Sequence, residues 1–464
     1  MQYVSTRGLA PSLNFEEAML TGLARDGGLY VPEYIPKFDK SFFRSLESKS
    51  YTEIAFLVMK PFIGGVFGDD ELKDVIEKAY ANFGCGEKAP LIKLSDNHFL
   101  LELFHGPTLA FKDFAMQLIG QLFQISLSKN KKKVTIIGAT SGDTGSAAIE
   151  AFRGISQVDV FILYPEGGVS EVQRRQMTTP TEENVHAISI DGSFDTCQAI
   201  VKDLFNDLSF RDEVNLAGVN SINWARIMAQ VVYYFSSVSR LGILNSNQKV
   251  NFTVPTGNFG DIFAGYISKQ MGLPISKLII ATNQNDILHR TLQTANYEKG
   301  EVFSSISPSM DIQVSSNFER ALYYAYDQNP VEIDGLFSEL KAAGKFRIGD
   351  SAYRGLQKHY CSGTATETET YQVMKKVGAK YDILVCPHTA VGLHVAENYL
   401  GDLPMISLAT AHPAKFPVAV EKATDIKPGL PDRVSHLFLK SERVTKLPNR
   451  LEIIKETIKE RRAT

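Results

Sequence analysis

The stretch LFHGPTLAFKDF, residues 103–114, leads through a Gly-Pro turn into a segment whose apolar residues recur every three or four positions. This spacing predicts a helix with a buried face that includes Phe114 and Leu118, and Thr108 is placed to cap its N-terminus. Lys112 falls in the first turn among apolar residues, where burial and the helix dipole both disfavour a positive charge and lower the pKa of its amine. Such an amine is a candidate imine-forming nucleophile. On this stretch alone, however, a lysine that extends along the apolar surface to reach solvent is the better explanation.

The composition narrows the class of protein. The 464 residues include 49 basic and 52 acidic side chains, for a net charge of −3, which argues against nucleic-acid and membrane-surface partners. We see neither a secretory leader nor an apolar run of membrane-spanning length. The four cysteines form no Cys-X-X-Cys pair, so the common zinc and redox spacings are absent. We therefore expect a cytoplasmic protein from a reduced compartment, with no bound metal.

Two regions of the chain alternate strands with helices. Short β-rich runs at residues 134–137 and 158–164 flank a glycine-rich loop and a helix, which is the order of a parallel βαβ unit. The pattern restarts with strand-like runs at residues 250–254 and 277–281. We predict an α/β fold of two open parallel-sheet lobes, joined by an apolar helix over residues 224–241.

We predict three parts in chain order. Residues 1–95 form a mainly helical N-terminal domain, residues 96–245 form a smaller lobe, and residues 246–464 form a larger lobe with the C-terminal tail. The apolar run at residues 381–385, just ahead of Pro387, predicts a further strand.

Two loops follow predicted strands, and open α/β sheets bind ligands at the carboxyl ends of their strands. The first, Thr140–Gly145, places hydroxyls and glycines before a helix, where successive backbone N–H groups can bind a carboxylate. The second, Thr256–Asp261, is the stronger phosphate candidate, although it matches neither the nucleotide P-loop nor the dinucleotide fingerprint. Taken alone, each loop fits an ordinary strand-to-helix turn equally well. His105, His388 and His412 lie near such motifs without metal-ligand spacing, which favours structural or substrate-orienting roles.

A lysine at a helix start, a phosphate loop and an anion loop together suggest pyridoxal phosphate. This cofactor needs an amine for its aldehyde, a site for its phosphate and a neighbouring site for the substrate carboxylate. At these residues the chain resembles the threonine synthases, pyridoxal-phosphate enzymes of the tryptophan-synthase β-like architecture (fold type II). The long N-terminal segment resembles the fungal and proteobacterial branch. The matching motifs are YVSTRG (3–8), DGGLYVP (26–32), HGPTLAFKDF (105–114), GATSGDTG (138–145), TGNFGD (256–261), PHTAVG (387–392) and ATAHPAKFP (409–417).

The resemblance implies roles for the matched residues. Lys112 would form the imine with the cofactor and later shuttle protons, and Thr410 would hydrogen-bond the pyridine nitrogen. The phosphate region of the cofactor would be held by Gly257, Asn258, Phe259 and Asp261. The substrate carboxylate would be received by Ser141, Gly142, Asp143 and Thr144. Asp143 stands where related enzymes often have an asparagine that contacts the ring hydroxyl, so its role is left open. The candidates for the substrate phosphate are Ser5, Thr6, Arg7 and Lys415, because arginine suits a bidentate grip and lysine a point charge.

The implied reaction converts O-phospho-L-homoserine and water to L-threonine and phosphate, by γ-elimination followed by addition of water at Cβ. Within the same fold type, a phospholyase or a threonine dehydratase is the alternative, and either would release ammonia and a keto acid. A noncatalytic metabolite sensor is a third possibility, against which the intact Lys112 and the phosphate loop count. The expected partner is a small molecule, and the expected assembly is a monomer or a small homo-oligomer.

Overall fold

Two parallel sheets organise the chain, and the computed structural model describes residues 1–462. The six-stranded sheet has the order β13-β10-β9-β14-β4-β3, and its neighbours are parallel except for the edge pair β3 and β4. In the register of this sheet, Ile406 pairs with Phe99 on one side and with Phe252 on the other. The strands are β3 (Leu91–Ser95), β4 (His98–Glu102), β9 (Val250–Pro255), β10 (Ile275–Thr282), β13 (Tyr360–Thr364) and β14 (Met405–Ala409).

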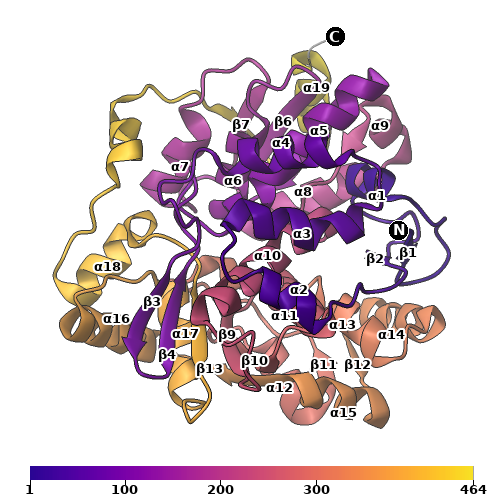
Figure 1. Ribbon diagram of the computed structural model, residues 1–464. Helices are drawn as coiled ribbons and strands as arrows, with labels where there is room; N and C mark the ends of the chain where they lie inside the picture. Colours follow the sequence, from indigo (N-terminus) through magenta and orange to yellow (C-terminus); the bar gives the residue numbers. More distant parts are fainter. Residues whose placement is uncertain (463–464) are drawn as a thin grey trace.

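The five-stranded sheet has the order β15-β7-β6-β5-β8 and is parallel throughout. It occupies the upper half of the molecule in Figure 1, and the six-stranded sheet occupies the lower half. Every residue of β6 is buried, as expected for a strand covered on both faces. Its strands are β5 (Val134–Ala139), β6 (Val158–Pro165), β7 (Val185–Ile190), β8 (Leu216–Ala217) and β15 (Thr445–Leu447).

Helices cover both sheets, and each lobe is named here for its sheet. The five-stranded lobe carries α5 (Lys112–Asn130), α6 (Asp143–Phe152), α7 (Glu171–Thr178), α8 (Phe194–Asn206), α9 (Leu208–Glu213) and α19 (Leu451–Arg461). The six-stranded lobe carries α11 (Gly260–Gln270), α12 (Ile287–Thr294), α13 (Phe318–Ala325), α14 (Pro330–Ala343), α15 (Asp350–His359), α16 (Glu367–Tyr381), α17 (Pro387–Glu397) and α18 (Pro417–Thr424), with the hairpin strands β11 (Asn296–Glu298) and β12 (Lys345–Arg347). Short 3-10 turns lie at η1 (Pro308–Met310), η2 (Pro413–Lys415) and η3 (Asp432–Leu439).

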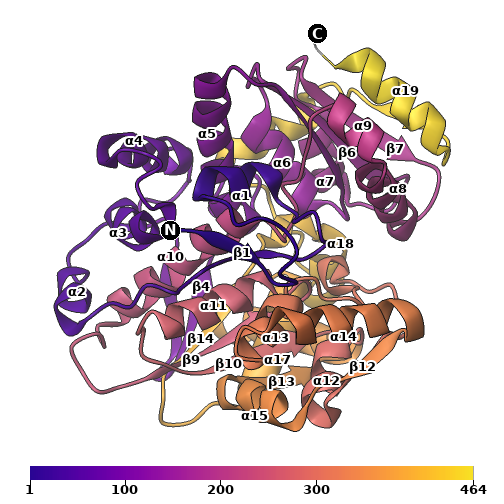
Figure 2. The ribbon, with the colours of Figure 1, turned by 90° about the vertical axis from the view of Figure 1, so that its right-hand side faces the viewer.

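The N-terminal segment is mainly helical, as predicted. It contains α1 (Phe15–Thr21), α2 (Lys40–Ser45), α3 (Tyr51–Ile63) and α4 (Asp69–Tyr80), together with the antiparallel pair β1 (Tyr3–Ser5) and β2 (Tyr30–Pro32). Asn14 caps α1 through a reciprocal capping box with Glu17. Helix α3 packs on the central helix α10 (Trp224–Leu241), and α4 packs on α5, so this segment covers one side of both lobes (Figures 1 and 2).

Helix α10 matches the predicted range, residues 224–241, and is buried from Trp224 to Ser239. It packs against α3, α5 and α11, which come from three different parts of the chain. Contact on every side explains why even polar residues of this helix, such as Gln230 and Ser237, are buried.

The sheets divide the chain differently from the predicted ranges 1–95, 96–245 and 246–464. Strand β4 falls in the second range but pairs with β14 of the six-stranded sheet. Strand β15 falls in the third range but pairs with β7 of the five-stranded sheet, and α19 packs on α8 (Figure 2). Each lobe is therefore completed by a segment from elsewhere in the chain.

Two local predictions are wrong. The run 381–385 is not a strand: α16 extends to Tyr381, Asp382 ends it with φ +54°, and Val385 packs into the core without ladder pairing. Thr108 does not cap the helix of Lys112, because α5 begins at Lys112 with no side-chain cap. Within residues 1–462, no helix combines the length and the apolar character needed to cross a membrane.

Candidate active site

A cavity of about 650 Å³ lies between the two lobes. The carboxyl ends of β5, β9 and β14 and the N-termini of α5, α6 and α11 border it, as expected for open α/β sheets. Nine of the predicted site residues line this one cavity: Lys112, Ser141, Asp143, Thr144, Gly257, Asn258, Phe259, Asp261 and Thr410. Gly142, Ser5, Thr6, Arg7 and Lys415 are not among the described residues that line it.

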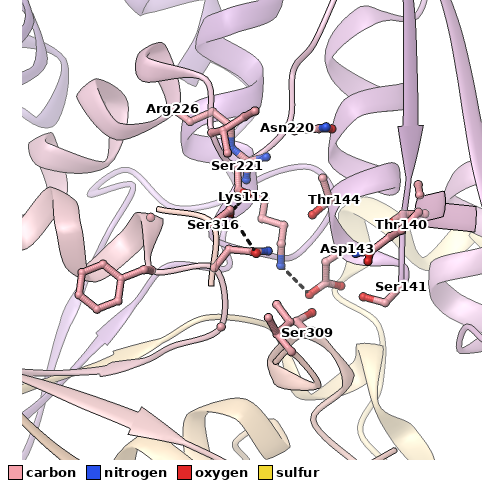
Figure 3. A pocket seen from close by; sticks show the side chains of 18 of the residues that line it. Lys112, Thr140, Ser141, Asp143, Thr144, Asn220, Ser221, Arg226, Ser309 and Ser316 are labelled. Carbon is pink, nitrogen blue, oxygen red and sulfur yellow. Dashed lines mark hydrogen bonds and ion pairs between the residues drawn. The ribbon is translucent and has the colours of Figure 1, made fainter. Parts of the chain in front are cut away.

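Lys112 is the first residue of α5, and only 9% of its side chain is exposed. Its Nζ lies 3.4 Å from Oδ2 of Asp143 and 4.7 Å from the centre of the Phe111 ring. Figure 3 shows the Lys112 amine and the Asp143 carboxylate pointing toward each other inside the cavity. Burial lowers the pKa of Lys112, and the positive charges of Lys415 and Arg226 lower it further, against the opposing effect of Asp143. The amine is therefore deprotonated at a lower pH than an exposed lysine, which is what a nucleophilic amine requires.

Asp143 is fixed as a carboxylate by its neighbours. Burial alone would raise its pKa, but the ammonium groups of Lys415 and Lys112 hold the pKa well below its usual range. Lys415 Nζ lies 3.0 Å from Oδ1, and Gln173 Nε2 donates to the same oxygen at 2.9 Å. Lys415 is completely buried and also donates to the carbonyl of Thr108 at 2.7 Å. Its ammonium group is thus bound by protein atoms, and Lys415 does not line the cavity.

The turn that precedes Lys112 is held by Asp113. Its carboxylate accepts hydrogen bonds from the N–H of Thr108 at 2.8 Å and from the Thr108 hydroxyl at 2.6 Å. Leu109, inside the turn, has φ +66°, and a side chain on Gly106 would overlap the Asp113 side chain. Burial raises the pKa of Asp113 to about 6, against the lowering effect of the Thr108 hydrogen bonds. Glycine and aspartate are required here because the turn folds tightly onto the start of α5.

The loop Thr256–Asp261 leads into α11 in a form suited to a phosphate. Phe259 adopts φ +64° at the N-cap position, and no side chain caps α11. The N-terminal N–H groups are therefore left for a ligand, and the helix dipole favours an anion there. Gly257 has no room for a side chain, since a Cβ would lie 2.5 Å from the carbonyl oxygen of Ser309.

Asp261 forms a buried cluster beside this loop. Its Oδ1 accepts hydrogen bonds from Tyr233 at 2.6 Å and from Tyr234 at 3.1 Å, whereas its Oδ2 has no partner among the described residues. Burial raises its pKa to about 7, although the two tyrosine hydroxyls and Lys112 act in the opposite direction. The carboxyl group is thus poised to hold a proton near neutral pH.

Arg226 is a cavity residue that the sequence-based prediction missed. It lies in the first turn of α10, is 3% exposed and makes one long hydrogen bond, from Nη1 to the carbonyl of Val219 at 3.4 Å. Within residues 1–462, its Nε has no hydrogen-bond partner and no carboxylate forms an ion pair with it. Burial lowers its pKa to about 10. Arg226 is the one charged residue in the stretch 224–239, and this was the signal that could have identified it.

Asn220 and Ser221 precede Arg226 and also line the cavity. Figure 3 shows these three residues on the side of Lys112 away from Ser141. The cavity therefore contains a buried guanidinium group distinct from the N-terminus of α11, and each is suited to a separate anion.

The candidates in the first β-strand region have other partners. Ser5 donates to Asp26 at 2.8 Å, and Thr6 donates to Glu319 at 2.6 Å. Arg7 pairs with the same Glu319 at 3.0 Å. Thr6 and Arg7 tie the N-terminal segment to α13, whereas Ser5 bonds within that segment, and none of the three lines the cavity.

His388 lines the cavity and accepts a hydrogen bond at Nε2 from the N–H of Ser309 at 3.2 Å. Burial lowers its pKa to about 4, so the ring is neutral at pH 7 with its proton on Nδ1. That Nδ1 has no partner among the described residues. In the part of the chain that the structure describes, no group of three or more His, Cys, Asp or Glu side chains is placed to hold a metal ion.

Three family models match the chain. The pyridoxal-phosphate-dependent enzyme family matches residues 86–335, which include Lys112 and the loop Thr256–Asp261. The threonine synthase N-terminus matches residues 2–80, and the threonine synthase C-terminal model matches residues 389–458. Together they span most of the cavity wall and the N-terminal helices.

Individual relatives agree with these matches. The chain is 50% identical over 454 residues to a threonine synthase from Pseudomonas aeruginosa, covering 97% of this chain and 96% of the relative. It is 45% identical over 456 residues to the threonine synthase of Saccharomyces cerevisiae, covering 91% and 88%. A crystal structure of threonine synthase from Brucella melitensis with bound pyridoxal phosphate has a TM-score of 0.96 at 50% identity and covers 100% of both chains. The chain therefore belongs to the threonine synthase family of pyridoxal-phosphate-dependent enzymes.

Proposed function

We propose that this chain converts O-phospho-L-homoserine and water to L-threonine and phosphate, with pyridoxal phosphate bound between its lobes. The observation that carries the proposal is the pairing of two separate anion sites in one cavity with a buried lysine of lowered pKa. A phosphorylated cofactor acting on a phosphorylated substrate needs two phosphate sites, in addition to a site for the substrate carboxylate. A substrate without a phosphate would need only one phosphate site.

The residues of the cavity fit the cofactor. Lys112 supplies the amine, the N-terminus of α11 supplies phosphate donors, and the buried Thr410 hydroxyl suits a pyridine nitrogen that needs no strong acid beside it. Four polar atoms of cavity-lining residues lack partners among the described residues: Arg226 Nε, Gln230 Oε1, Asp261 Oδ2 and His388 Nδ1. An unpaired buried polar group costs about 1–3 kcal/mol, so a polar ligand that pairs with these atoms would bind favourably.

When bound, the cofactor supplies an electron sink for negative charge that develops on the substrate carbon skeleton. Lys112 Nζ would then remove the proton from Cα and return it later, because its lowered pKa lets the amine act as a base near neutral pH. Asp143 would hold Nζ near its place between these steps through the 3.4 Å contact. The side chain is 9% exposed, which limits proton exchange with bulk water.

The substrate carboxylate would bind at the N-terminus of α6. Gly142 is the N-cap residue with no side-chain cap, and Ser141 and Thr144 line the cavity beside it. Thr140 holds the loop in shape by accepting hydrogen bonds from the N–H groups of Gly142 at 2.9 Å and Gly145 at 2.8 Å. Asp143 would act on Lys112 rather than on the negatively charged carboxylate.

The substrate phosphate would bind to Arg226, with Asn220 and Ser221 as further donors. This proposal is supported by the burial of the guanidinium group and by its lack of an ion pair within residues 1–462. It replaces the sequence-based candidates at residues 5–7 and Lys415, whose polar groups have protein partners.

Product analysis tests the function. The holoenzyme is incubated with O-phospho-L-homoserine while phosphate, threonine and ammonia are followed together. Equal amounts of phosphate and threonine support the proposal. Phosphate or substrate loss accompanied by ammonia and a keto acid would instead assign a phospholyase or a dehydratase, and no turnover would contradict enzymatic activity on this substrate.

We also propose a cytoplasmic location and a monomer or small homo-oligomer. All four cysteines are free thiols, which fits a reducing compartment. Sedimentation of the purified holoenzyme measures the assembly state, and fractionation of cells measures the location.

A further inference from the structure

One short segment, residues 315–320, contacts both of the loops that form the anion sites. We call it the bridging segment, and it contains the start of α13. On the cofactor side, the Ser315 hydroxyl donates to the carbonyl of Gly257 at 2.6 Å. The Ser316 hydroxyl lies 3.2 Å from the side-chain oxygen of Asn258 and 3.4 Å from the Ser221 hydroxyl, with which it lies side by side in Figure 3.

Asn317 makes the central contacts. Its Nδ2 donates to the carbonyl of Ser221 at 3.0 Å and to the carbonyl of Asn258 at 3.0 Å. Its backbone N–H also donates to the Asn258 carbonyl at 3.0 Å, and its side chain is fully buried. One amide group thus joins the loop before Arg226 to the loop before α11.

Arg320 fixes the orientation of that amide. Its Nη1 donates to Oδ1 of Asn317, so the amide oxygen is engaged and Nδ2 must face the two carbonyls. Its Nη2 donates to the carbonyls of Ile222 at 2.6 Å and Tyr30 at 2.8 Å, which ties the substrate-side loop to the N-terminal segment. Arg320 is completely buried and is held mainly by backbone oxygens, so it stiffens the region instead of presenting a charge to a ligand.

We propose that Asn317 is a positioning residue that sets the spacing between the two anion sites. The inference rests on the proposed function, since it takes the two sites to hold the phosphates of cofactor and substrate. The loops belong to different lobes: Ser221 follows β8 of the five-stranded sheet, and Asn258 follows β9 of the six-stranded sheet. Removing the Asn317 amide breaks its bonds to the Ser221 and Asn258 carbonyls and leaves the longer Ser316 hydroxyl contacts as the remaining side-chain link, so both phosphates lose a preorganised site.

The test compares three variants of the full chain. Asn317→Ala removes the bridge, and Ser315→Ala removes a bond to the cofactor-side loop alone. Asn184→Ala is the matched control, because Asn184 also donates to backbone carbonyls, at Phe152, Ile155 and Val158, in a region that does not line the cavity. Two binding constants are measured: pyridoxal phosphate on cofactor-free enzyme by absorbance, and inorganic phosphate on holoenzyme by calorimetry.

We expect Asn317→Ala to weaken both bindings about tenfold or more, whereas Ser315→Ala weakens cofactor binding alone. Asn184→Ala should lower the melting temperature and leave both constants within about twofold. Loss of only one binding in Asn317→Ala, or no loss beyond that of the control, would overturn the proposal. Equal loss of both bindings in Ser315→Ala would assign the coupling to the whole segment and overturn the role of Asn317.

If Asn317→Ala does not fold, Asn317→Ser decides the question, because serine keeps one short donor. It should weaken both bindings about threefold or more, and loss of a single binding would reject the bridge. Both constants are measured without turnover. A wild-type enzyme that binds both ligands but forms no threonine would therefore reject the proposed function and not this inference.

Discussion

Lys112 Nζ lies 3.4 Å from Asp143 Oδ2, yet the pKa of Lys112 is lowered rather than raised. Burial is the main cause of the lowered pKa, and Lys415, whose Nζ lies 3.0 Å from the other oxygen of Asp143, adds to it. The buried Lys415 offsets much of the carboxylate charge, and burial then dominates at Lys112. The site thus holds the amine in place through Asp143 without giving it the pKa of an ordinary ion pair.

Replacing Lys112 tests the identity of the nucleophile. Lys112→Ala should lower turnover by on the order of a thousandfold or more and abolish the imine absorbance of the holoenzyme, because no other amine takes its place. Lys112→Arg is the control, since it keeps a positive charge near Asp143 but cannot form the imine. Either variant with turnover close to wild type would rule out the assigned role.

Replacing Lys415 tests the sharing of Asp143. In Lys415→Met, Asp143 loses its nearest cation and its negative charge acts fully on Lys112, so the pKa of Lys112 should rise. The rate of cofactor incorporation depends on the free amine, so its pH profile should move to higher pH. Breaking a buried pair also costs about 3–5 kcal/mol, and a lower melting temperature is expected. An unshifted profile would show that Lys415 does not control Lys112.

Gly106→Ala should disturb the turn that places Lys112, because the added methyl group would overlap the Asp113 side chain. We expect a lower melting temperature and slower cofactor incorporation. Gly401→Ala is the matched control, since a Cβ at Gly401 meets no atom within 4 Å. Equal behaviour of the two variants would mean that the turn tolerates the overlap.

Asp261 should make stability fall as the pH rises. An unfolded aspartate has a pKa near 3.8, and the folded value is raised to about 7, so the folded state holds its proton more tightly. Below about pH 4 the group is protonated in both the folded and the unfolded state, so its ionisation does not change the free energy of unfolding. Between about pH 4 and pH 7 the unfolded state alone ionises, and stability decreases by on the order of a few kcal/mol. In cofactor-free protein, Asp261→Asn should therefore gain melting temperature relative to wild type at pH 8 but not at pH 4. The same difference at both pH values would contradict the raised pKa.

Much of the fold follows from local patterns in the sequence. Helix α10 and strands β5, β6, β9 and β10 match their predicted positions to within about two residues, because buried helices and strands carry long apolar runs. The run 381–385 shows the limit of that rule: its apolar residues pack against a core without joining a sheet, and periodicity does not distinguish the two. The exchange of β4 and β15 between lobes depends on pairing across long sequence separations, which local patterns do not contain.

The same distinction applies to the cavity. Motifs predicted that Lys112 and both glycine-rich loops belong to the site, because turns and helix N-termini are determined by residues close together in the sequence. Lys415 was expected to face a substrate, but it is buried and pairs with Asp143. Asp143 is distant in the sequence, so the motif around Lys415 gives no sign of this pairing. Arg226 was missed for the converse reason: whether a charge in an apolar helix has a protein partner is known only once the helix is packed.

Arg226 provides the sharpest test of the two-anion cavity. In Arg226→Met the substrate phosphate loses its buried cation, so the KM for O-phospho-L-homoserine should rise about a hundredfold, as expected for loss of about 3 kcal/mol from a charge-assisted contact. The affinity for pyridoxal phosphate, measured on cofactor-free enzyme, should change by less than about threefold because the N-terminus of α11 is untouched. Arg7→Met is the control: it removes an arginine that pairs with Glu319 outside the cavity and should leave KM nearly unchanged. If Arg226→Met weakened cofactor binding and left KM alone, the guanidinium group would belong to the cofactor phosphate, and the substrate phosphate would need another site.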